Sequence, residues 1–251
     1  MIQDFLLEIG TEPLPARFIA SAAEQLERGL RQAIERHSLQ TPQTSYKTFA
    51  TLRRLAVLTT AIAESSPERT GRVKGPPKKL LKDAAGAFTP QAVGFAKKQG
   101  VKPEDLAVEG EFLYAEIRAP GEETAIILAR IIPELLRALE FPKSLEWEPS
   151  RFKFGRPIRS IAALYGVTVV PIEVAGVKSG KKIWGLAALA HKPITLKSPG
   201  GYAENLRKAG VLGNVDERRA ELLARLKTAA TEAGGALDLD EGLVAETVYM
   251  T

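Results

Sequence analysis

The segment that most constrains the fold is "FLLEIGTEPLPARF", residues 5–18. Its first part, residues 5–9, is apolar on both faces of an extended strand, which predicts a strand in the middle of a sheet. Pro13 and Pro15 follow where a first helical turn tolerates proline, because the N–H groups there have no acceptor inside the helix. The segment therefore predicts an interior strand that turns directly into a helix.

The predicted helix carries a single apolar stripe with a spacing of four residues. Its members are Leu14, Phe18, Ala22, Leu26, Leu30 and Ile34. This spacing places them on one face of a helix that ends near His37 and packs on its own sheet. Thr11 and Glu12 are left in the turn near the positive end of the helix, where either a capping role or an anion-binding role fits.

Strand patterns continue along the rest of the chain. Residues 46–64 predict a strand or hairpin pair, and residues 112–117 predict another strand. The segments "LEWE", "PIRSIAALYG", "TVVPIEVAG" and "KKIWGLAALA" predict an antiparallel meander. Together with the helices, this order predicts an α+β fold, a mixed or antiparallel sheet with flanking helices, followed by the start of a helical segment.

Helical patterns dominate the second half outside that meander. A helix is predicted over 124–139, with a stripe of Leu128, Ile131, Leu135 and Leu139 and a kink or break at Pro133. Later helices are predicted over 202–209, from the cap Asn214 to Gly234, and after the cap Asp240. The last one keeps its apolar spacing to the final residue, so we expect the sequence to be cut from a longer protein.

Positive charge is concentrated in two parts of the chain, although the whole chain carries only +5. Residues 66–100 hold eight basic and two acidic side chains, and residues 178–210 hold seven and one, a balance of +6 in each. Such asymmetry fits either a polyanionic partner such as RNA or a solvated face. We predict one α+β domain over 1–198 with a basic excursion over 65–103, and a helical linker or the start of another domain over 199–251.

Several classes of chemistry are excluded or disfavoured. The chain has no cysteine and two histidines, which excludes disulfides and thiolate nucleophiles and disfavours cysteine or histidine metal sites. No apolar run approaches the roughly 18 residues that a membrane span needs, so we expect a soluble protein without a membrane contact. The absence of cysteine is compatible with a reducing cytoplasm, which is the localisation we predict. The spacings of a Walker loop, a dinucleotide-binding loop and a hydrolase nucleophile elbow are absent.

Two groups of residues are candidates for a site. Glu8 lies in an otherwise apolar strand and needs a partner, for which Arg53 or Arg54 is suited; the two arginines are adjacent, so on a strand one faces Glu8 and the other faces solvent or a ligand. The second group, residues 144–160, interleaves aromatic with basic side chains. That pattern fits either a core segment or a surface that stacks RNA bases and binds phosphates.

The same stretches resemble a known family. In order, they are "FLLEIGTEPLP", "RRLAV", "KGPPKK", "AFTPQAVGFAKKQGV", "LEWEPSRFKFGRPIRSIAALYG" and "GGYAENLRKAGV" with "DERR". Their order and spacing resemble the N-terminal third of the bacterial glycyl-tRNA synthetase β subunit. The chain departs from that pattern at Pro13, at Leu52 and over 184–188, where "WGLAA" replaces a "GHRF"-like motif.

The resemblance implies a subunit of an α2β2 class II ligase that joins glycine to tRNA(Gly) with ATP. It implies a B3/B4-like fold here, the α subunit and the remainder of the β subunit as partners, and the adenylation site, with its ATP and Mg²⁺, on the α subunit. We therefore expect no catalytic residue, metal or cofactor on this chain. The predicted RNA-binding residues are Arg53, Arg54, Lys74, Lys78, Lys79, Arg151, Arg156 and Arg159.

Two alternatives stay open. The chain is either an RNA-binding and scaffold portion of the ligase or a module that docks the α subunit or the rest of β without touching RNA. An editing-like hydrolase is a third reading, for which the sequence offers no nucleophile, base and metal set.

Overall fold

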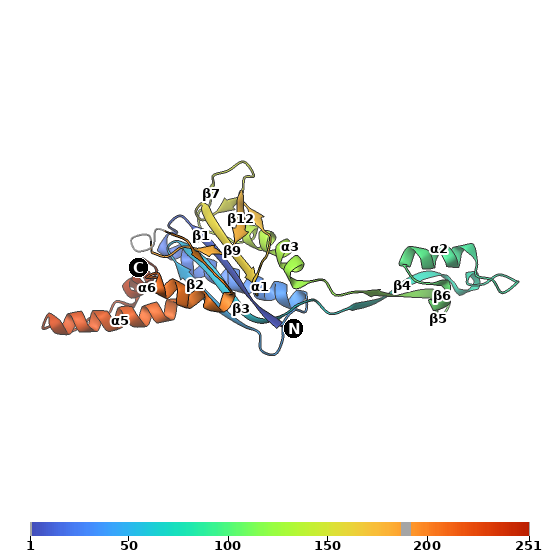
Figure 1. The fold of residues 1–251 in the computed structure, drawn as a ribbon, viewed down its shortest axis with the longest axis horizontal. Coiled ribbons are helices and arrows are strands. Elements are labelled where there is room, and N and C mark those ends of the chain that lie inside the picture. The colour runs from blue at the N-terminus through green and yellow to red at the C-terminus, as the bar shows by residue number, and fades with distance from the viewer. Residues whose placement is uncertain (1, 187–191, 251) are drawn as a thin grey trace. The chain divides into compact units, whose positions relative to one another are not determined.

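The computed structural model describes residues 2–186 and 192–250 (Figure 1). The predicted α+β class is confirmed: the described residues form a seven-stranded mixed sheet, three smaller antiparallel sheets and six α-helices. The chain divides into two compact units, here called the first unit (Met1–Glu64 with Glu123–Thr251) and the second unit (Ser65–Glu122). Ala187, Ala188 and His191 lie outside the described residues.

The first strand is the centre of the large sheet, as its apolar sequence predicts. β1 (Ile2–Thr11) pairs antiparallel with β3 (Arg54–Ala63) on one side and β9 (Ile158–Tyr165) on the other. The predicted hairpin over 46–64 is also confirmed, because β2 (Ser45–Thr51) pairs with β3 across a short turn. Both long edges of β1 are therefore occupied by neighbouring strands.

The predicted antiparallel meander is wrong in part. β12 (Val177–Gly180) lies parallel to β9, and the next strand leaves the sheet. The reason is a hairpin turn in which Ala175 and Gly176 have φ of 52° and 74°, so the chain folds back and β12 returns along β9. The remaining short strands are β7 (Leu145–Glu146), β8 (Lys153–Phe154), β10 (Thr168–Val169), β11 (Glu173–Val174), β13 (Lys182–Ile183) and β14 (Ile194–Thr195).

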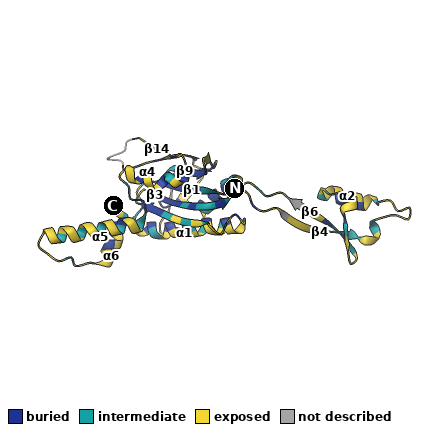
Figure 2. Ribbon diagram, turned by 60° about the horizontal axis from the view of Figure 1, so that its bottom comes forward, coloured by how far each residue is buried: buried dark blue, intermediate teal, exposed yellow. Residues whose placement is uncertain are grey.

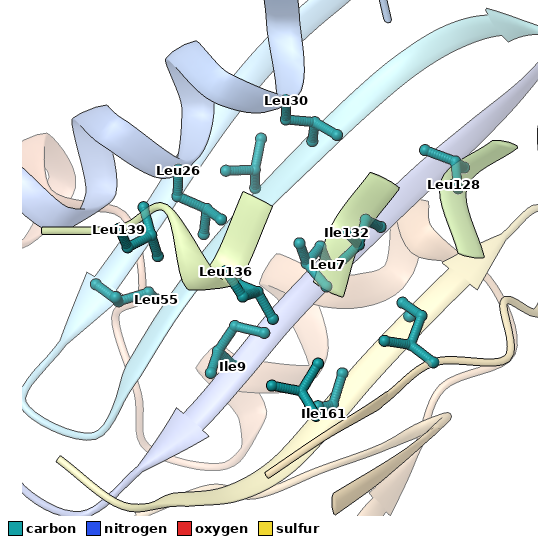
Figure 3. Close-up of a cluster of buried hydrophobic side chains, with 14 of the residues drawn as sticks. Leu7, Ile9, Leu26, Leu30, Leu55, Leu128, Ile132, Leu136, Leu139 and Ile161 are labelled. Atoms are coloured by element: carbon teal, nitrogen blue, oxygen red, sulfur yellow. The ribbon is translucent and has the colours of Figure 1, made fainter. Parts of the chain in front are cut away.

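Two helices cover one face of the sheet. The predicted stripe of α1 (Ala16–Arg36) is confirmed, because all six of its members are buried. Figure 3 shows Leu26 and Leu30 from α1 meeting side chains of α3 (Thr124–Arg137) and of the strands. This layer forms the larger of the two cores in the first unit.

The predicted stripe of α3 is wrong in part, because of its four members only Leu128 and Leu139 are buried. Its buried side chains include Leu128, Ile132 and Leu136, whereas Ile131 and Leu135 are only half-buried. The helix also continues unbroken through Pro133. The segment is apolar on more than one face, so its spacing fits two adjacent stripes, and the neighbouring sheet and α1 decide which one is buried.

The C-terminal helices belong to the first unit, in contrast to the predicted boundary at 198. The short helices η3 (Pro199–Gly201) and α4 (Tyr202–Lys208) cover the second face of the sheet, where Tyr202 and Leu206 are buried. The predicted caps are confirmed: Asn214 accepts from Glu217 N at the start of α5 (Val215–Glu232), and Asp240 accepts from Leu243 N at the start of α6 (Glu241–Met250). Figure 2 shows that α5 is mostly exposed.

The second unit is a small α+β body with its own core. Its sheet contains β4 (Arg69–Pro77), β6 (Phe112–Ala119) and β5 (Ala107–Glu109), all antiparallel, with α2 (Pro90–Gln99) and the turns η1 (Lys78–Leu80) and η2 (Pro103–Asp105). The unit extends past the predicted limit of 103 because β6 pairs along the length of β4.

The first unit is closed where the second unit is inserted. Thr124 Oγ1 donates to Ala63 O at 2.6 Å, and Thr124 N donates to Glu64 O at 2.8 Å. The chain therefore leaves and re-enters the first unit at adjacent points. No helix in the described residues is long and apolar enough to cross a membrane.

Candidate functional site

A buried polar cluster lies on β1. Glu8 is 2% exposed, and its Oε2 lies 3.1 Å from Arg54 Nη1. The Tyr202 hydroxyl donates to the same carboxylate oxygen. The predicted ion pair of Glu8 with one of the two arginines is thus confirmed, and it is Arg54; Arg53 is exposed in the turn between β2 and β3.

Arg54 therefore has a structural role. A side chain that is 5% exposed and bound to a carboxylate offers no surface to an RNA phosphate. Its second amino group donates to the Trp184 carbonyl oxygen at 2.6 Å, which ties the segment after β13 to the cluster. Burial raises the pKa of Tyr202 well above its ordinary value, and the Glu8 carboxylate adds to the effect, so the tyrosine stays a hydrogen-bond donor.

A cleft of about 1600 Å³ opens beside this cluster on the first unit. Its charged lining contains six arginines and three glutamates, a balance of +3, and no lysine. The arginines are Arg53, Arg54, Arg159, Arg207, Arg218 and Arg225. The chain as a whole has 18 arginines and 17 lysines, so the lining is enriched in arginine. The planar guanidinium group of arginine can bind a phosphate through two hydrogen bonds.

The ends of several elements bring these arginines together. Thr11 N donates to Arg53 O at 2.9 Å, which holds the β2–β3 turn against the end of β1. Arg159 is near the start of β9, and its Nε lies 2.7 Å from Glu12 Oε1. The turn residues Thr11 and Glu12 make no capping bond to α1, so of the two predicted roles capping is wrong. Glu12 instead holds an arginine at the edge of the cleft.

Two of the six arginines have no acidic partner among the described residues. One is Arg53, at the surface. The other is Arg218, which is 5% exposed and donates only to carbonyl oxygens, of Ala50 at 2.7 Å, Val248 at 2.6 Å, Leu212 and Gly213. Burial lowers the pKa of Arg218 from its usual value. The wall of the cleft thus contains an uncompensated cation, which favours an anion in the cleft.

The sequence-based prediction missed Arg218 and Trp184. In the sequence Arg218 is one of two adjacent arginines in a charged helix, and no local signal separates it from Arg219. Trp184 stands in the segment that departs from the family pattern, which draws attention to the position but not to its exposure.

The predicted lysines lie in the second unit. Lys78 Nζ lies 2.7 Å from Glu111 Oε1, and Lys74 Nζ lies 3.5 Å from the centroid of the Phe112 ring. Lys79 has no acidic partner within the described part of the chain. The whole unit holds ten basic and eight acidic residues, a balance of +2, because β5, β6 and their loops add acidic side chains to the basic stretch.

The aromatic-basic segment 144–160 is part of the core. The Phe152 and Phe154 rings are buried, with centroids 6.0 Å apart, and Trp147 packs edge-on against Phe152 at 6.1 Å. The two phenylalanine rings are therefore closed to RNA bases, and the Trp147 ring is half-buried. Arg151 pairs with Glu146 at 3.3 Å, Arg156 donates to the neighbouring Gly155 carbonyl oxygen at 2.9 Å, and neither lines the cleft.

Among the described residues no group of three or more histidine, cysteine, aspartate or glutamate side chains could hold a metal ion. The chemistry that the cleft supports is recognition of an anion.

Fold and cleft together define an α+β protein with an arginine-lined cleft of net positive charge. The chain belongs to the glycyl-tRNA synthetase beta subunit family, which it matches over residues 5–251. It is 37% identical over 256 residues to the glycine--tRNA ligase beta subunit of Desulfitobacterium hafniense strain Y51, covering 100% of this chain and 36% of that protein. The beta subunits of Desulforamulus reducens and Moorella thermoacetica are 37% and 34% identical, with 98% and 100% of this chain and 36% of each relative covered. The chain spans about a third of the length of these relatives.

Proposed function

We propose that this chain is the part of a glycine–tRNA ligase β subunit that binds tRNA(Gly) and supports the assembly, and that it works in the cytoplasm. The observation that carries the proposal is the arginine lining of the cleft, with its balance of +3. Phosphate groups supply most of the affinity of nucleic acids for proteins, and clustered arginines are their usual partners.

At the cleft, a phosphate can replace the glutamate in exposed arginine–glutamate ion pairs. Pairs such as Arg159–Glu12 and Arg207–Glu217 are well exposed and contribute only about 0–1 kcal/mol each, so a phosphate can replace the glutamate at little cost. Arg53 needs no exchange because no acid holds it in the described structure. In the second unit Lys74, Lys78 and Lys79 are proposed as further contacts.

We also propose a division of labour in the ligase. The reaction joins glycine to tRNA(Gly) at the expense of ATP, and ATP with Mg²⁺ is expected on the α subunit. This chain would bind and orient tRNA without taking part in bond formation. Arg151 and Arg156, on the segment after β7, remain expected phosphate contacts outside the cleft.

The proposal is tested by measuring tRNA binding as a function of salt. Affinity should fall by roughly 0.7–0.9 log units per log unit of salt for each phosphate contact. Arg53→Ala and Arg159→Ala should each reduce that slope by about 1. Arg219→Ala, which removes a surface arginine that does not line the cleft, is the matched control and should leave the slope unchanged. Absence of binding, or binding that ignores salt, would refute the proposal.

A second candidate is a docking module for the α subunit or the rest of β. Leu243 and Met250 on α6 are 63% and 58% exposed, which is unusual for large apolar side chains on one short helix. Size-exclusion chromatography of the chain mixed with purified α subunit separates the two candidates. Co-elution that Leu243→Ser abolishes, without any tRNA binding, would favour docking.

A further inference from the structure

We infer that the arginine-lined cleft takes a short unpaired stretch of RNA, with one base stacked on Trp184. The inference rests on the proposed function, because it specifies which form of RNA the cleft accepts. It assigns to Trp184 the role of a stacking platform.

Exposure singles out Trp184. The chain has sixteen aromatic side chains, all of them in the described residues, and Trp184 alone is exposed, at 45%. The others are buried or half-buried. An aromatic ring held open to solvent forgoes the burial that stabilises the rest, and this one lines the cleft.

The platform is held in place by the protein. Arg54 Nη2 donates to the Trp184 carbonyl oxygen, and Leu186 N donates to Ala209 O at 3.0 Å, at the end of α4. Arg54 is in turn fixed by Glu8 and Tyr202. The buried polar cluster thus fixes the backbone that carries Trp184, so less backbone freedom is lost when a base stacks on the ring.

The shape and lining of the cleft distinguish unpaired RNA from other anions. A duplex hides its base faces and offers phosphates, for which a flat basic surface is enough. Here Leu52, Val211 and Leu212 give the concave lining an apolar part beside the arginines. The volume of about 1600 Å³ exceeds the roughly 300–1,000 Å³ of small-molecule pockets, which fits a segment of a chain better than a small metabolite.

The positive charges of the lining indicate where the sugar-phosphate backbone of the RNA would lie. Arg53 at the rim and Arg218 in the wall are the two lining arginines without a carboxylate partner in the described structure. A phosphate of a strand whose base lies on Trp184 can contact Arg53 directly. Arg218 is buried and bonded to carbonyl oxygens, so it acts on the phosphates only through its electrostatic field.

The test uses the intrinsic fluorescence of the ring. Trp147 and Trp184 are the only tryptophans, so in the Trp147→Phe variant all indole emission comes from Trp184. We expect a single-stranded oligoribonucleotide to quench this emission in a saturable manner, and the same sequence annealed to its complement to leave it unchanged.

Substitutions at the platform give a second readout. Trp184→Ala should weaken binding of the single strand by roughly 5- to 160-fold, the range for loss of one stacked base, and Trp184→Phe should restore most of it. Because the side chain is half open to solvent, both variants should unfold at the same urea concentration as the parent.

The outcomes separate this inference from the proposed function. If Trp184→Ala binds tRNA as the parent does, with the same salt slope, RNA binding stands and the stacking role is wrong. Equal quenching by duplex and single strand would also overturn it. If no RNA binds at any salt concentration, both proposals fall.

Discussion

Glu8 shows how much one buried charge constrains this protein. Its only charged partner in the described structure is Arg54, and both side chains are almost fully buried. Glu8→Gln removes the negative charge with little change of shape and leaves the guanidinium uncompensated. We expect the free energy of unfolding to fall by about 3–5 kcal/mol.

Urea denaturation measures this loss, and Glu12→Gln is the control. The control breaks the exposed pair with Arg159, so its effect should stay below about 1 kcal/mol. Equal effects of the two substitutions would show that the buried pair contributes no more than a surface pair.

Tyr165 makes the stability of the first unit sensitive to alkaline pH. Burial raises the pKa of Tyr165 to about 12, and its hydroxyl donates to Ala63 O at 2.8 Å. In the unfolded chain the pKa is about 10. Below pH 10 both states are protonated and the contribution is complete; between about 10 and 12 the unfolded state releases its proton first, so the free energy of unfolding falls as pH rises.

Urea midpoints between pH 9 and 11.5 test this dependence. Tyr165→Phe cannot ionise, so its midpoint should decline less steeply with pH than that of the parent. Parallel declines would assign the alkaline loss to other groups.

At the residue scale the sequence predicts partners only where chemistry leaves few choices. A charge inside an apolar strand demands a counter-ion, which is why the pairing of Glu8 was predictable. The side chain of Arg218 was not, because its acceptors are backbone carbonyl oxygens from positions as distant as Ala50 and Val248. Such contacts leave no pattern in residue types.

Among the elements, α5, α6 and β2 are joined by Arg218. Its guanidinium binds Val248 O on α6 and Ala50 O on β2 while its backbone belongs to α5. Arg218→Met removes these hydrogen bonds from a charged donor, at about 1.5–3 kcal/mol for each bond lost. We expect a loss of at least about 2 kcal/mol of unfolding free energy, and Arg218→Lys should not restore it because an ammonium lacks the planar fork.

Arg219 offers a neighbouring control for that experiment. It is 40% exposed and pairs with Glu241, so Arg219→Met should change the unfolding free energy by no more than about 1 kcal/mol. Thermal denaturation of the three variants provides the comparison. A melting temperature of Arg218→Met equal to that of the control would contradict the joining role.

Elements were predicted well where one face alone is apolar. Only one face of α1 is apolar, so the sequence predicts which face is buried. Helix α3 is apolar on several faces, and packing against the sheet determines which of them is buried. The parallel pairing of β12 with β9 was missed because no strand was predicted over Val177–Gly180. The segment is brought beside β9 by a hairpin whose direction depends on the conformation of Ala175 and Gly176.

For the whole molecule, the two units have separate cores. The two clusters of buried side chains in the first unit contain no residue from 65–122, and every residue of the third cluster, around Ala92, Ala96 and Leu113, lies within 65–122. Replacing Ser65–Glu122 with a short glycine-serine linker should therefore leave the first unit folded, since Thr124 already bonds to Ala63 and Glu64 at the junction. Circular dichroism and a cooperative thermal transition are the measurements.

Removal of α6 is the informative contrast. This helix buries Val244 and Val248 and supplies an acceptor to Arg218, so its loss should broaden or abolish the transition. If the chain unfolded upon loss of 65–122 but stayed folded without α6, the conclusion that the first unit depends on α6 and not on the second unit would be wrong.

The extent of each unit and the cleft lie beyond what local patterns predict. The second unit ends at Glu122 because a strand after the basic excursion completes its sheet. The cleft is lined by residues from Glu8 to Met250, which only the fold brings together. Three of the eight predicted RNA-binding arginines and lysines nevertheless line it, namely Arg53, Arg54 and Arg159.

The central position of β1 has a consequence for biosynthesis. One edge of the strand can pair with β3 as soon as that hairpin is made, but the other edge waits for β9, which begins at Ile158. At about 5–20 residues per second, the ribosome needs on the order of ten seconds to synthesise the chain between Ala63, where β3 ends, and Ile158. An open strand edge is a template for pairing with other chains, so the nascent polypeptide is most vulnerable to aggregation during this interval, and the vulnerability ends when β9 emerges from the exit tunnel.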